Sequence, residues 1–302
     1  MRWNPLNSGD DVIDARGSSG SRMGGSPIGL IAMLLFNRRT RGLGIVAILF
    51  FVGLQVFGGG GGFDVSNGFG GQVGAGGGTP RGIPASQDPE KDLKDFSAYV
   101  FVTAQRGWQS AFEQQGKPYE KAKLVLYRRG VNTSGCGFAN SSVGPFYCPG
   151  DRRVYIDLGF YRDMTDVLGA PGDLAWAYVI AHEVGHHVQQ QLGTEATVRD
   201  LQREEPGKMN ELSVRLELQA DCFAGIWAHR VYTQGDLEQG DLDEALNAAA
   251  AVGDDRIQKN AGGGVNPDSF THGSSAQRQF WFTTGYKSGK PADCDTFSVE
   301  KI

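Results

Sequence analysis

The chain has 302 residues, a formal net charge of −5 and 45 glycines. This length suits one catalytic domain with appendages, or two small domains. The negative charge gives no electrostatic reason to expect nucleic acid as a partner, because phosphate binding requires a basic face. Glycine is concentrated in the first 85 residues and apolar periodicity follows Pro89, so we expect a single domain over residues 90–302.

Residues 42–63 carry no charged side chain and include the apolar run LGIVAILFFVGLQVF. As a helix they would extend about 33 Å, close to the roughly 30 Å of a hydrocarbon core. Arg38, Arg39 and Arg41 precede the run, so the positive-inside rule predicts a single-pass transmembrane helix with a cytoplasmic N-terminus. The alternatives are a cleaved signal peptide or a buried core helix. The late start of the run, the lack of an A-x-A-like site and the glycine-rich flanks favour the span.

The segments on either side of this run are polar and rich in glycine. Residues 1–41 are predicted to be a disordered, basic and glycine-rich cytoplasmic segment. Residues 64–89 are predicted to be a flexible glycine-rich linker. The domain over 90–302 would then lie outside the cytoplasm, in a periplasmic or extracellular space, tethered to the cytoplasmic membrane.

The four cysteines are Cys136, Cys148, Cys222 and Cys294, and none forms a C-x-x-C pair. A cysteine zinc site is therefore not expected. An exported domain favours two disulfides. The short loop between Cys136 and Cys148 makes that pairing the easiest, which leaves Cys222 with Cys294. The alternative for each is a buried free thiol.

The stretch Gly172–Leu192 has the apolar periodicity of an amphipathic helix and contains the motif H-E-x-x-H. His182 and His186 lie four residues apart, so their rings share one face about 5–6 Å apart and both can approach one zinc ion. Glu183 lies beside the pair, where a general base is needed. The alternative, two histidines spaced by chance, is disfavoured because the motif lies on a well-formed helix.

A third ligand is expected from a second helix over Asn210–Tyr232. The metzincin pattern requires glycine at 189 and histidine at 192, which this chain lacks. Glu217 and Asp221 instead lie four apart on the apolar side of the second helix, where a carboxylate is costly to bury unless something neutralises it. Zinc would neutralise Glu217, and the ring N–H of a ligand histidine would neutralise Asp221. The alternative for Asp221 is a salt bridge with an arginine.

These motifs together resemble the bacterial YpfJ-type neutral zinc metallopeptidases, and the resemblance runs from about residue 88 to 297. The segments that carry it are His182–His187 (HEVGHH), Glu217–Cys222 (ELQADC), Gly144–Pro149 (GPFYCP) and Asp268–Arg278 (DSFTHGSSAQR). The ligand set is similar to that of the gluzincins. The resemblance implies an α+β, zincin-like domain, mostly helical with a small β-sheet. It also implies one zinc ion, with Glu217 as its third ligand and Asp221 in support.

His272 lies in the stretch THGSSAQR, at an expected junction between a loop and a helix. In gluzincins a histidine downstream of the third ligand stabilises the oxyanion, and the similarity suggests His272 for this role. Such a donor is worth about 3–4 kcal/mol. The alternative is a histidine that caps the helix or bonds to the backbone. Arg278 would pair either with a carboxylate near the site or with solvent.

Other residues are expected to have supporting roles. His187 projects about 100° away from His186 and would not bind the same metal. His229 is expected to be structural, and Glu211 is a weaker ligand candidate because its surroundings are more polar. The alternating stretch Arg153–Phe160 predicts a strand, which by similarity to zincins would bind extended substrate by β-augmentation, or else serve as an ordinary sheet strand. Residues 241–259 predict a scaffolding helix.

The sequence therefore predicts a membrane-anchored zinc metalloendopeptidase with a protein or peptide substrate and a lipid bilayer as partners. A zinc-activated water would attack the peptide bond, and Glu183 would take its proton and deliver it to the leaving amine. The alternative is a catalytically silent, zinc-containing peptide-binding module of the cell envelope. Glu183 argues against it, since a structural zinc site closes with four protein ligands and needs no base.

Overall fold

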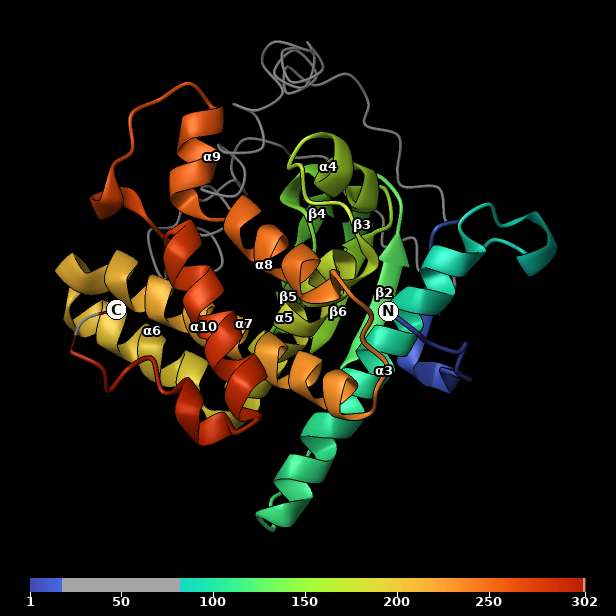
Figure 1. The fold of residues 1–302 in the computed structure, drawn as a ribbon, viewed down its shortest axis with the longest axis horizontal. Coiled ribbons are helices and arrows are strands. Elements are labelled where there is room, and N and C mark those ends of the chain that lie inside the picture. The colour runs from blue at the N-terminus through green and yellow to red at the C-terminus, as the bar shows by residue number, and fades with distance from the viewer. Residues whose placement is uncertain (18–81, 301) are drawn as a thin grey trace, which may run out of the picture.

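The computed structural model describes residues 1–17, 82–300 and 302, which are mostly helical and include one four-stranded and one two-stranded sheet (Figure 1). The predicted α+β class is confirmed. The helices are α3 (Lys91–Gln114), α4 (Phe160–Asp166), α5 (Asp173–Leu192), α6 (Thr194–Glu204), α7 (Met209–Thr233), α8 (Asp241–Ala251), α9 (Asp254–Asn260) and α10 (Ser275–Ser288). The strands are β1 (Val12–Asp14), β2 (Lys123–Tyr127), β3 (Gly130–Asn132), β4 (Phe138–Asn140), β5 (Phe146–Cys148) and β6 (Arg153–Asp157).

The larger sheet has the strand order β1-β2-β6-β5. The first three strands are parallel, and β5 is antiparallel to β6. The two central strands are buried along almost their whole length, as expected for strands covered on both faces. In the described part of the chain, β5 is the edge strand on the side of α5.

This order corrects the expectation that Arg153–Phe160 receives an extended substrate. Strand β6 ends at Asp157, and β2 and β5 pair with its two edges. Its alternating pattern was sufficient to predict a strand, but the position of a strand within a sheet depends on partners distant in the sequence. Among the described strands, the sheet edge on the side of α5 belongs to β5.

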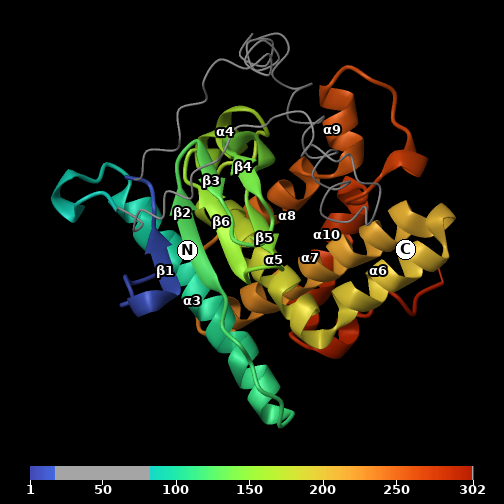
Figure 2. The same ribbon diagram turned by 180° about the vertical axis from the view of Figure 1, so that it is seen from behind.

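Helix α5 lies between β5 on one side and α7 on the other (Figure 2). Because it is covered on several sides, most of its residues are buried, including His182 and Glu183 of the histidine motif. Gly193 ends the helix in the left-handed conformation, with φ of 79°. Its N-cap is Gly172, and Asp173 is the first helical residue.

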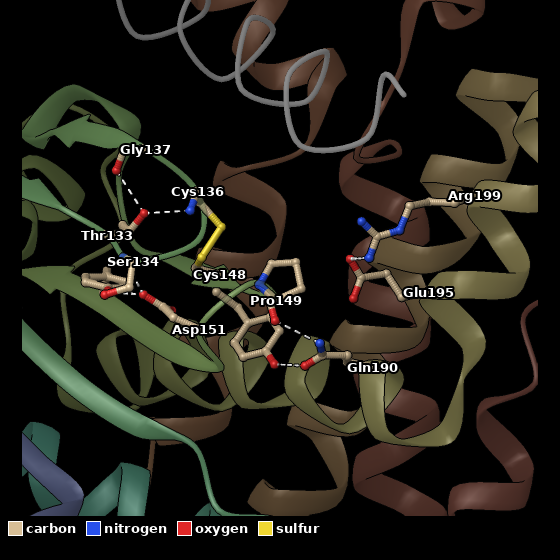
Figure 3. Close-up of a disulfide and its surroundings, with 12 residues drawn as sticks. Thr133, Ser134, Cys136, Gly137, Cys148, Pro149, Asp151, Gln190, Glu195 and Arg199 are labelled. Atoms are coloured by element: carbon tan, nitrogen blue, oxygen red, sulfur yellow. Dashed lines mark hydrogen bonds and ion pairs between the residues drawn. A yellow bond between two sulfur atoms is a disulfide. The ribbon is translucent and has the colours of Figure 1, made fainter. Parts of the chain in front are cut away.

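Helices α7 and α10 approach so closely that only glycine fits at one contact. A Cβ atom added to Gly285 would lie 1.9 Å from the carbonyl oxygen of Cys222. The contact is reinforced by the disulfide Cys222–Cys294, which joins α7 to the turn after α10. Figure 3 shows the second disulfide, Cys136–Cys148, which ties the loop before β4 to β5. Both predicted pairings are confirmed.

Residues 1–17 differ from the prediction of a disordered segment over residues 1–41. Strand β1 pairs in parallel with β2, and Trp3 packs against Phe96 and Tyr99 with ring centroids 5.2 and 6.0 Å away. The N-terminal amine lies 2.6 Å from a carboxylate oxygen of Asp173. Local sequence did not indicate this order because three-residue strands are stabilised by tertiary contacts rather than by their own propensity.

Arg16 fixes the other end of this segment. Its side chain is buried and bonds to the carboxylates of Asp14 and Asp88, and Asp88 lies just before α3. The predicted transmembrane helix at 42–63, most of the predicted linker at 64–89 and the rest of the 1–41 segment lie outside the described residues. Among the helices of the described residues, none has the length and apolarity needed to cross a membrane.

The predicted helix over 241–259 is two helices. Helix α8 ends at Ala251 and α9 begins at Asp254. The break brings Asp254 beneath the loop before α10, where its Oδ2 accepts hydrogen bonds from the backbone amides of Thr271 and His272. The break between α8 and α9 therefore positions Asp254, which supports the predicted site residue His272.

Candidate metal centre

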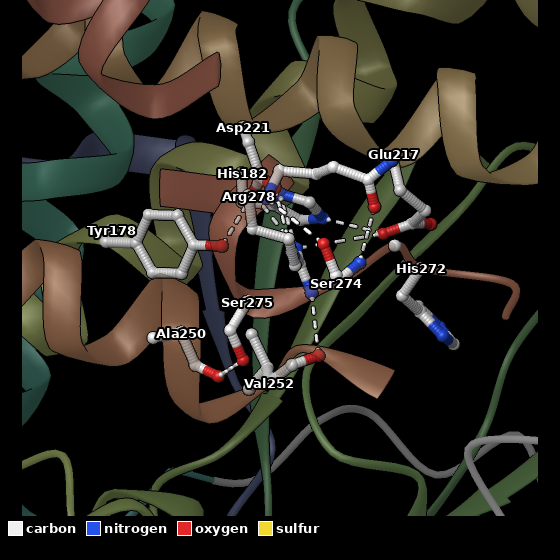
Figure 4. Close-up of polar contacts among 12 residues, drawn as sticks. Tyr178, His182, Glu217, Asp221, Ala250, Val252, His272, Ser274, Ser275 and Arg278 are labelled. Atoms are coloured by element: carbon white, nitrogen blue, oxygen red, sulfur yellow. Dashed lines mark hydrogen bonds and ion pairs between the residues drawn. The ribbon is translucent and has the colours of Figure 1, made fainter. Parts of the chain in front are cut away.

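Three side chains from two helices converge on one point. His182 and His186 project from α5, and Glu217 projects from α7 (Figure 4 shows His182 and Glu217). Their ligand atoms all lie within 4.8 Å of one another. The Nε2 atoms of His182 and His186 are 3.2 and 3.5 Å from the carboxylate oxygens of Glu217. Two atoms that bind zinc at tetrahedral positions lie about 3.3 Å apart, so the three residues fit a zinc ion.

Gly185 explains how the two helices come this close. A Cβ atom there would lie 3.1 Å from the carbonyl oxygen of Ala220, tighter than an ordinary contact. The glycine between the two ligand histidines therefore lets α5 rest on the backbone of α7, one turn beyond Glu217.

Asp221 orients the first histidine. Its carboxylate is fully buried and lies 2.8 Å from Nδ1 of His182. Because the carboxylate is an acceptor, Nδ1 carries the hydrogen and Nε2 keeps its lone pair for a metal. Arg278 donates to both carboxylate oxygens at 2.7 and 2.9 Å, and the Tyr178 hydroxyl donates at 2.5 Å (Figure 4). Burial opposes ionisation, but Arg278 and His182 hold the pKa of Asp221 below its usual value.

Both interpretations of Asp221 thus apply, since it contacts a ligand histidine and forms a salt bridge. Tyr178, which donates to Asp221, is not among the residues predicted for the site. The signal that was available is its spacing, because Tyr178 lies four residues before His182 and shares its face.

Gln189 orients the second histidine. Its Oε1 lies 2.9 Å from Nδ1 of His186, and its amide nitrogen donates to the Leu216 carbonyl at 2.7 Å. Gln189 is fully buried, and the sequence analysis used it only to exclude the metzincin class. Each ligand histidine therefore has a partner at Nδ1, and both direct Nε2 toward Glu217.

The electrostatics of the three residues suit a cation. Burial by itself would lower the pKa of His182, but Asp221 and Glu217 raise it to about 10. Burial opposes ionisation of Glu217, yet His186 and His182 hold its pKa well below the usual range. These surroundings favour a positive charge at this point, and the binding of a metal ion there would displace protons from the three side chains.

Glu183 lies beside the cluster on the wall of a cavity of about 170 Å³. It is buried, and burial raises its pKa despite the opposing effect of His186 and His182. A buried carboxylate with a raised pKa and no ligand position is suited to accept and return a proton. The residues that line the cavity include Val143, Phe146, Tyr147, Phe160, Leu168, Val252 and Ile257 as well as the three ligands.

His272 also lines this cavity, below Glu217 in Figure 4. Its Nδ1 lies 3.3 Å from Asp254 Oδ1, and no hydrogen bond or ion pair joins its Nε2 to another described residue. Asp254 raises the pKa of His272 against the effect of burial. The alternative role as a helix cap is wrong, because Ser274 caps α10 and forms a capping box with Gln277. Its role as an oxyanion donor stays a prediction.

The remaining candidates lie away from the cluster. His187 bonds to the Glu120 carbonyl at 2.7 Å, and His229 bonds to the Tyr286 carbonyl at 2.7 Å. Glu211 is exposed and pairs with Arg215 one turn further along α7. These contacts agree with the structural roles expected for the two histidines.

The model of the protein family described as "Putative neutral zinc metallopeptidase" matches residues 1–297. The chain belongs to this family. The match includes residues 1–17, which pack on the domain, and the resemblance predicted from the sequence motifs is confirmed. Membership of the family implies zinc, and two imidazoles with one carboxylate form a donor set of catalytic zinc sites.

Relatives from two groups of bacteria are similar to this family member. The Escherichia coli (strain K12) protein named "Uncharacterized protein YpfJ" is 48% identical over 298 residues, covering 98% of this chain and 99% of its own length. The Mycobacterium tuberculosis (strain H37Rv) protein named "Uncharacterized protein Rv2575" is 46% identical over 197 residues, covering 61% of this chain and 65% of its own length. No solved structure matches the chain.

Proposed function

We propose that the protein is a zinc endopeptidase that binds one zinc ion through His182, His186 and Glu217. The observation that carries this proposal is the position of Glu183, a buried carboxylate on the cavity wall that belongs to none of the three metal-binding positions. Three protein ligands leave a fourth position open, as in catalytic zinc sites. A closed structural site would need no such base.

The residues around the cluster divide the chemistry among them. When bound, zinc acts as a Lewis acid and lowers the pKa of water toward about 7. Glu183 takes a proton from the attacking water and delivers it to the leaving amine. His272, held by Asp254, donates a hydrogen bond to the oxygen on which negative charge develops.

The open edge of β5 supports a peptide substrate. A chain lying along β5 would add a strand to the sheet beside α5, with backbone hydrogen bonds that do not depend on side chains. The cavity beside it is lined mainly by apolar side chains. Its volume of about 170 Å³ resembles that of an engineered cavity of about 150 Å³ that binds benzene. We therefore propose a large apolar side chain next to the scissile bond.

We also propose that the protein is attached to the cytoplasmic membrane through residues 42–63, with the catalytic domain outside the cytoplasm. The apolar run supports attachment, and the two disulfides support an oxidising compartment. The pairing of β1 with β2 supports one amendment, because residues 12–14 must share a compartment with the domain that they join. The proposal therefore places the N-terminus on the same side as the catalytic domain.

The test compares wild type with Glu183→Gln, each loaded with zinc and incubated with a broad peptide library. We expect both to bind zinc and the variant to lose at least about a hundredfold in kcat/KM, because a positioned base contributes 10²–10⁴-fold. Cleavage products are measured by mass spectrometry. Equal cleavage by both proteins would exclude Glu183 as the base. Zinc binding without cleavage by wild type would favour the peptide-binding module.

A further inference from the structure

Glu195 is a buried carboxylate for which the proposed chemistry has no use. It is the second residue of α6, and only 5% of its surface is exposed. It lines the same cavity as His186 and Pro149, the residue that follows β5. Figure 3 shows its side chain on α6 beside Arg199.

One oxygen of this carboxylate has a partner and the other has none in the described part of the chain. Oε1 accepts a hydrogen bond from Arg199 at 2.5 Å. Oε2 is buried without a hydrogen-bond partner among the described residues. Among the described residues, Asp151 and Gln202 also have a buried side-chain oxygen without a hydrogen-bond partner, but neither residue lines the cavity.

The two other carboxylates of the cavity wall already have roles, since Glu217 belongs to the metal cluster and Glu183 is the proposed base. Burial raises the pKa of Glu195 and outweighs the opposing effect of Arg199 and His186. A buried acceptor without a partner is costly, and an ionised acceptor forms its strongest hydrogen bonds with cationic donors. Arg199 is 38% exposed, so solvent screens the repulsion that it would exert on a second cation.

We propose that Glu195 recognises a cationic nitrogen of the substrate through Oε2 and is a specificity-determining residue of the cavity. This inference rests on the proposed peptidase function, because it assumes that peptides enter the cavity. The cationic nitrogen is either the ammonium or guanidinium group of a lysine or arginine side chain, or the free α-amine of a peptide. The two sources share the chemistry that Oε2 selects.

The test measures binding without cleavage. Peptides of one sequence, with lysine or norleucine at each position in turn and with a free or acetylated N-terminus, are titrated against zinc-loaded Glu183→Gln by calorimetry. We expect one cationic nitrogen to improve affinity roughly tenfold to a hundredfold, as for a hydrogen bond to a charged group. Whether a side chain or the N-terminus produces the gain identifies the source.

Three further variants, made in the same background, test the residue itself. Glu195→Gln keeps the shape of the side chain and should abolish the preference. Glu204→Gln, an exposed position on the same helix, should leave it unchanged. Arg199→Gln removes the partner of Oε1 but keeps the carboxylate, so the preference should remain. Thermal unfolding confirms that each variant is folded.

The outcomes separate this inference from the proposed function. Equal affinity for cationic and neutral peptides, or an Arg199→Gln variant that behaves like Glu195→Gln, would overturn the inference and assign Glu195 to structure. Cleavage by wild type without such a preference would leave the peptidase proposal intact. A preference that depends on Glu195, in a wild type that cleaves no peptide, would support the inference and overturn the peptidase proposal.

Discussion

Glu217 and Asp221 lie one turn apart on α7, but their surroundings give them different roles. The carboxylate of Asp221 receives hydrogen bonds from His182, Tyr178 and Arg278, so its lone pairs are engaged. Glu217 faces the two Nε2 atoms instead. The division follows from depth, because Asp221 is fully enclosed between α5, α7 and α10, whereas Glu217 lines the cavity.

Replacing Glu217 should therefore remove the metal. We expect Glu217→Ala to lose zinc on dialysis against a weak chelator, because two imidazoles alone bind the ion much less tightly. The matched control is Glu211→Ala, an exposed carboxylate on the same helix, which should retain zinc at the wild-type ratio. Zinc is measured by atomic emission. Full zinc content in Glu217→Ala would show that another residue is the third ligand.

The convergence of His182, His186 and Glu217 was predictable because their spacing and burial are local properties of two helices. A spacing of four residues on one helix predicts a shared face, and a buried carboxylate predicts a partner. Gln189, Asp254 and Glu195 were not identified in this way. The roles of Asp254 and Glu195 depend on tertiary contacts with α10 and with the cavity, and that of Gln189 depends partly on α7. Short-range spacing carries little information about such contacts.

At the scale of elements, the close contact of α7 with α10 positions the support of the site. Arg278 lies two turns before Gly285 on α10, and Asp221 lies directly before Cys222 on α7. The glycine contact therefore determines how closely the arginine approaches the carboxylate that holds His182. A change at the contact should reach the metal cluster through this pair.

Gly285→Ala should destabilise the protein and weaken metal binding. The added methyl would lie 1.9 Å from a backbone oxygen that cannot rotate away, so the helices must separate. Overpacking of this kind costs about 1–3 kcal/mol, occasionally more. The control is Gly207→Ala, which adds a methyl group in open space at an ordinary φ. Gly235 is unsuitable as a control because its φ is 79°. Denaturant unfolding and zinc titration measure both effects, and unchanged stability in Gly285→Ala would contradict the close contact.

The helices that carry the motifs were predicted nearly to their ends, because their apolar periodicity extends over many residues. The expected helices over 172–192 and 210–232 are observed as Asp173–Leu192 and Met209–Thr233. The sheet was not predictable to the same degree. Strand β1 pairs with β2 across more than a hundred residues of sequence, and its three residues carry no periodicity of their own.

At the scale of the whole molecule, the N-terminal segment constrains how the chain meets a membrane. Strand β1, Trp3 and Arg16 all contact residues that follow residue 81, namely β2, α3 and Asp88 just before α3. A chain folded in this way cannot have its first residues on one side of a bilayer and its catalytic domain on the other. Residues 17 and 82, which flank the segment 18–81, therefore lie in the same compartment.

Thiol labelling tests this arrangement in intact cells. Cysteines are introduced at two exposed positions, Asn7→Cys in the N-terminal segment and Lys117→Cys after α3. The four native cysteines are paired in disulfides and should give little background. A membrane-impermeant maleimide should modify both introduced cysteines to the same extent, because both lie on one side. Labelling of Lys117→Cys alone would restore the single-pass arrangement with a cytoplasmic N-terminus.

The two disulfides have a consequence for where the folded protein is stable. Cys222 and Cys294 enclose α8, α9, α10 and the loop between α9 and α10, which together supply Asp254, His272 and Arg278. In the chain-entropy model this loop is worth about 4 kcal/mol and the Cys136–Cys148 loop about 3 kcal/mol. Together these are a large share of the 5–15 kcal/mol by which domains are typically stable. Under the proposed function, the newly made chain would therefore be a poor peptidase and an easy substrate for other proteases until its thiols are oxidised, which would protect the compartment of synthesis.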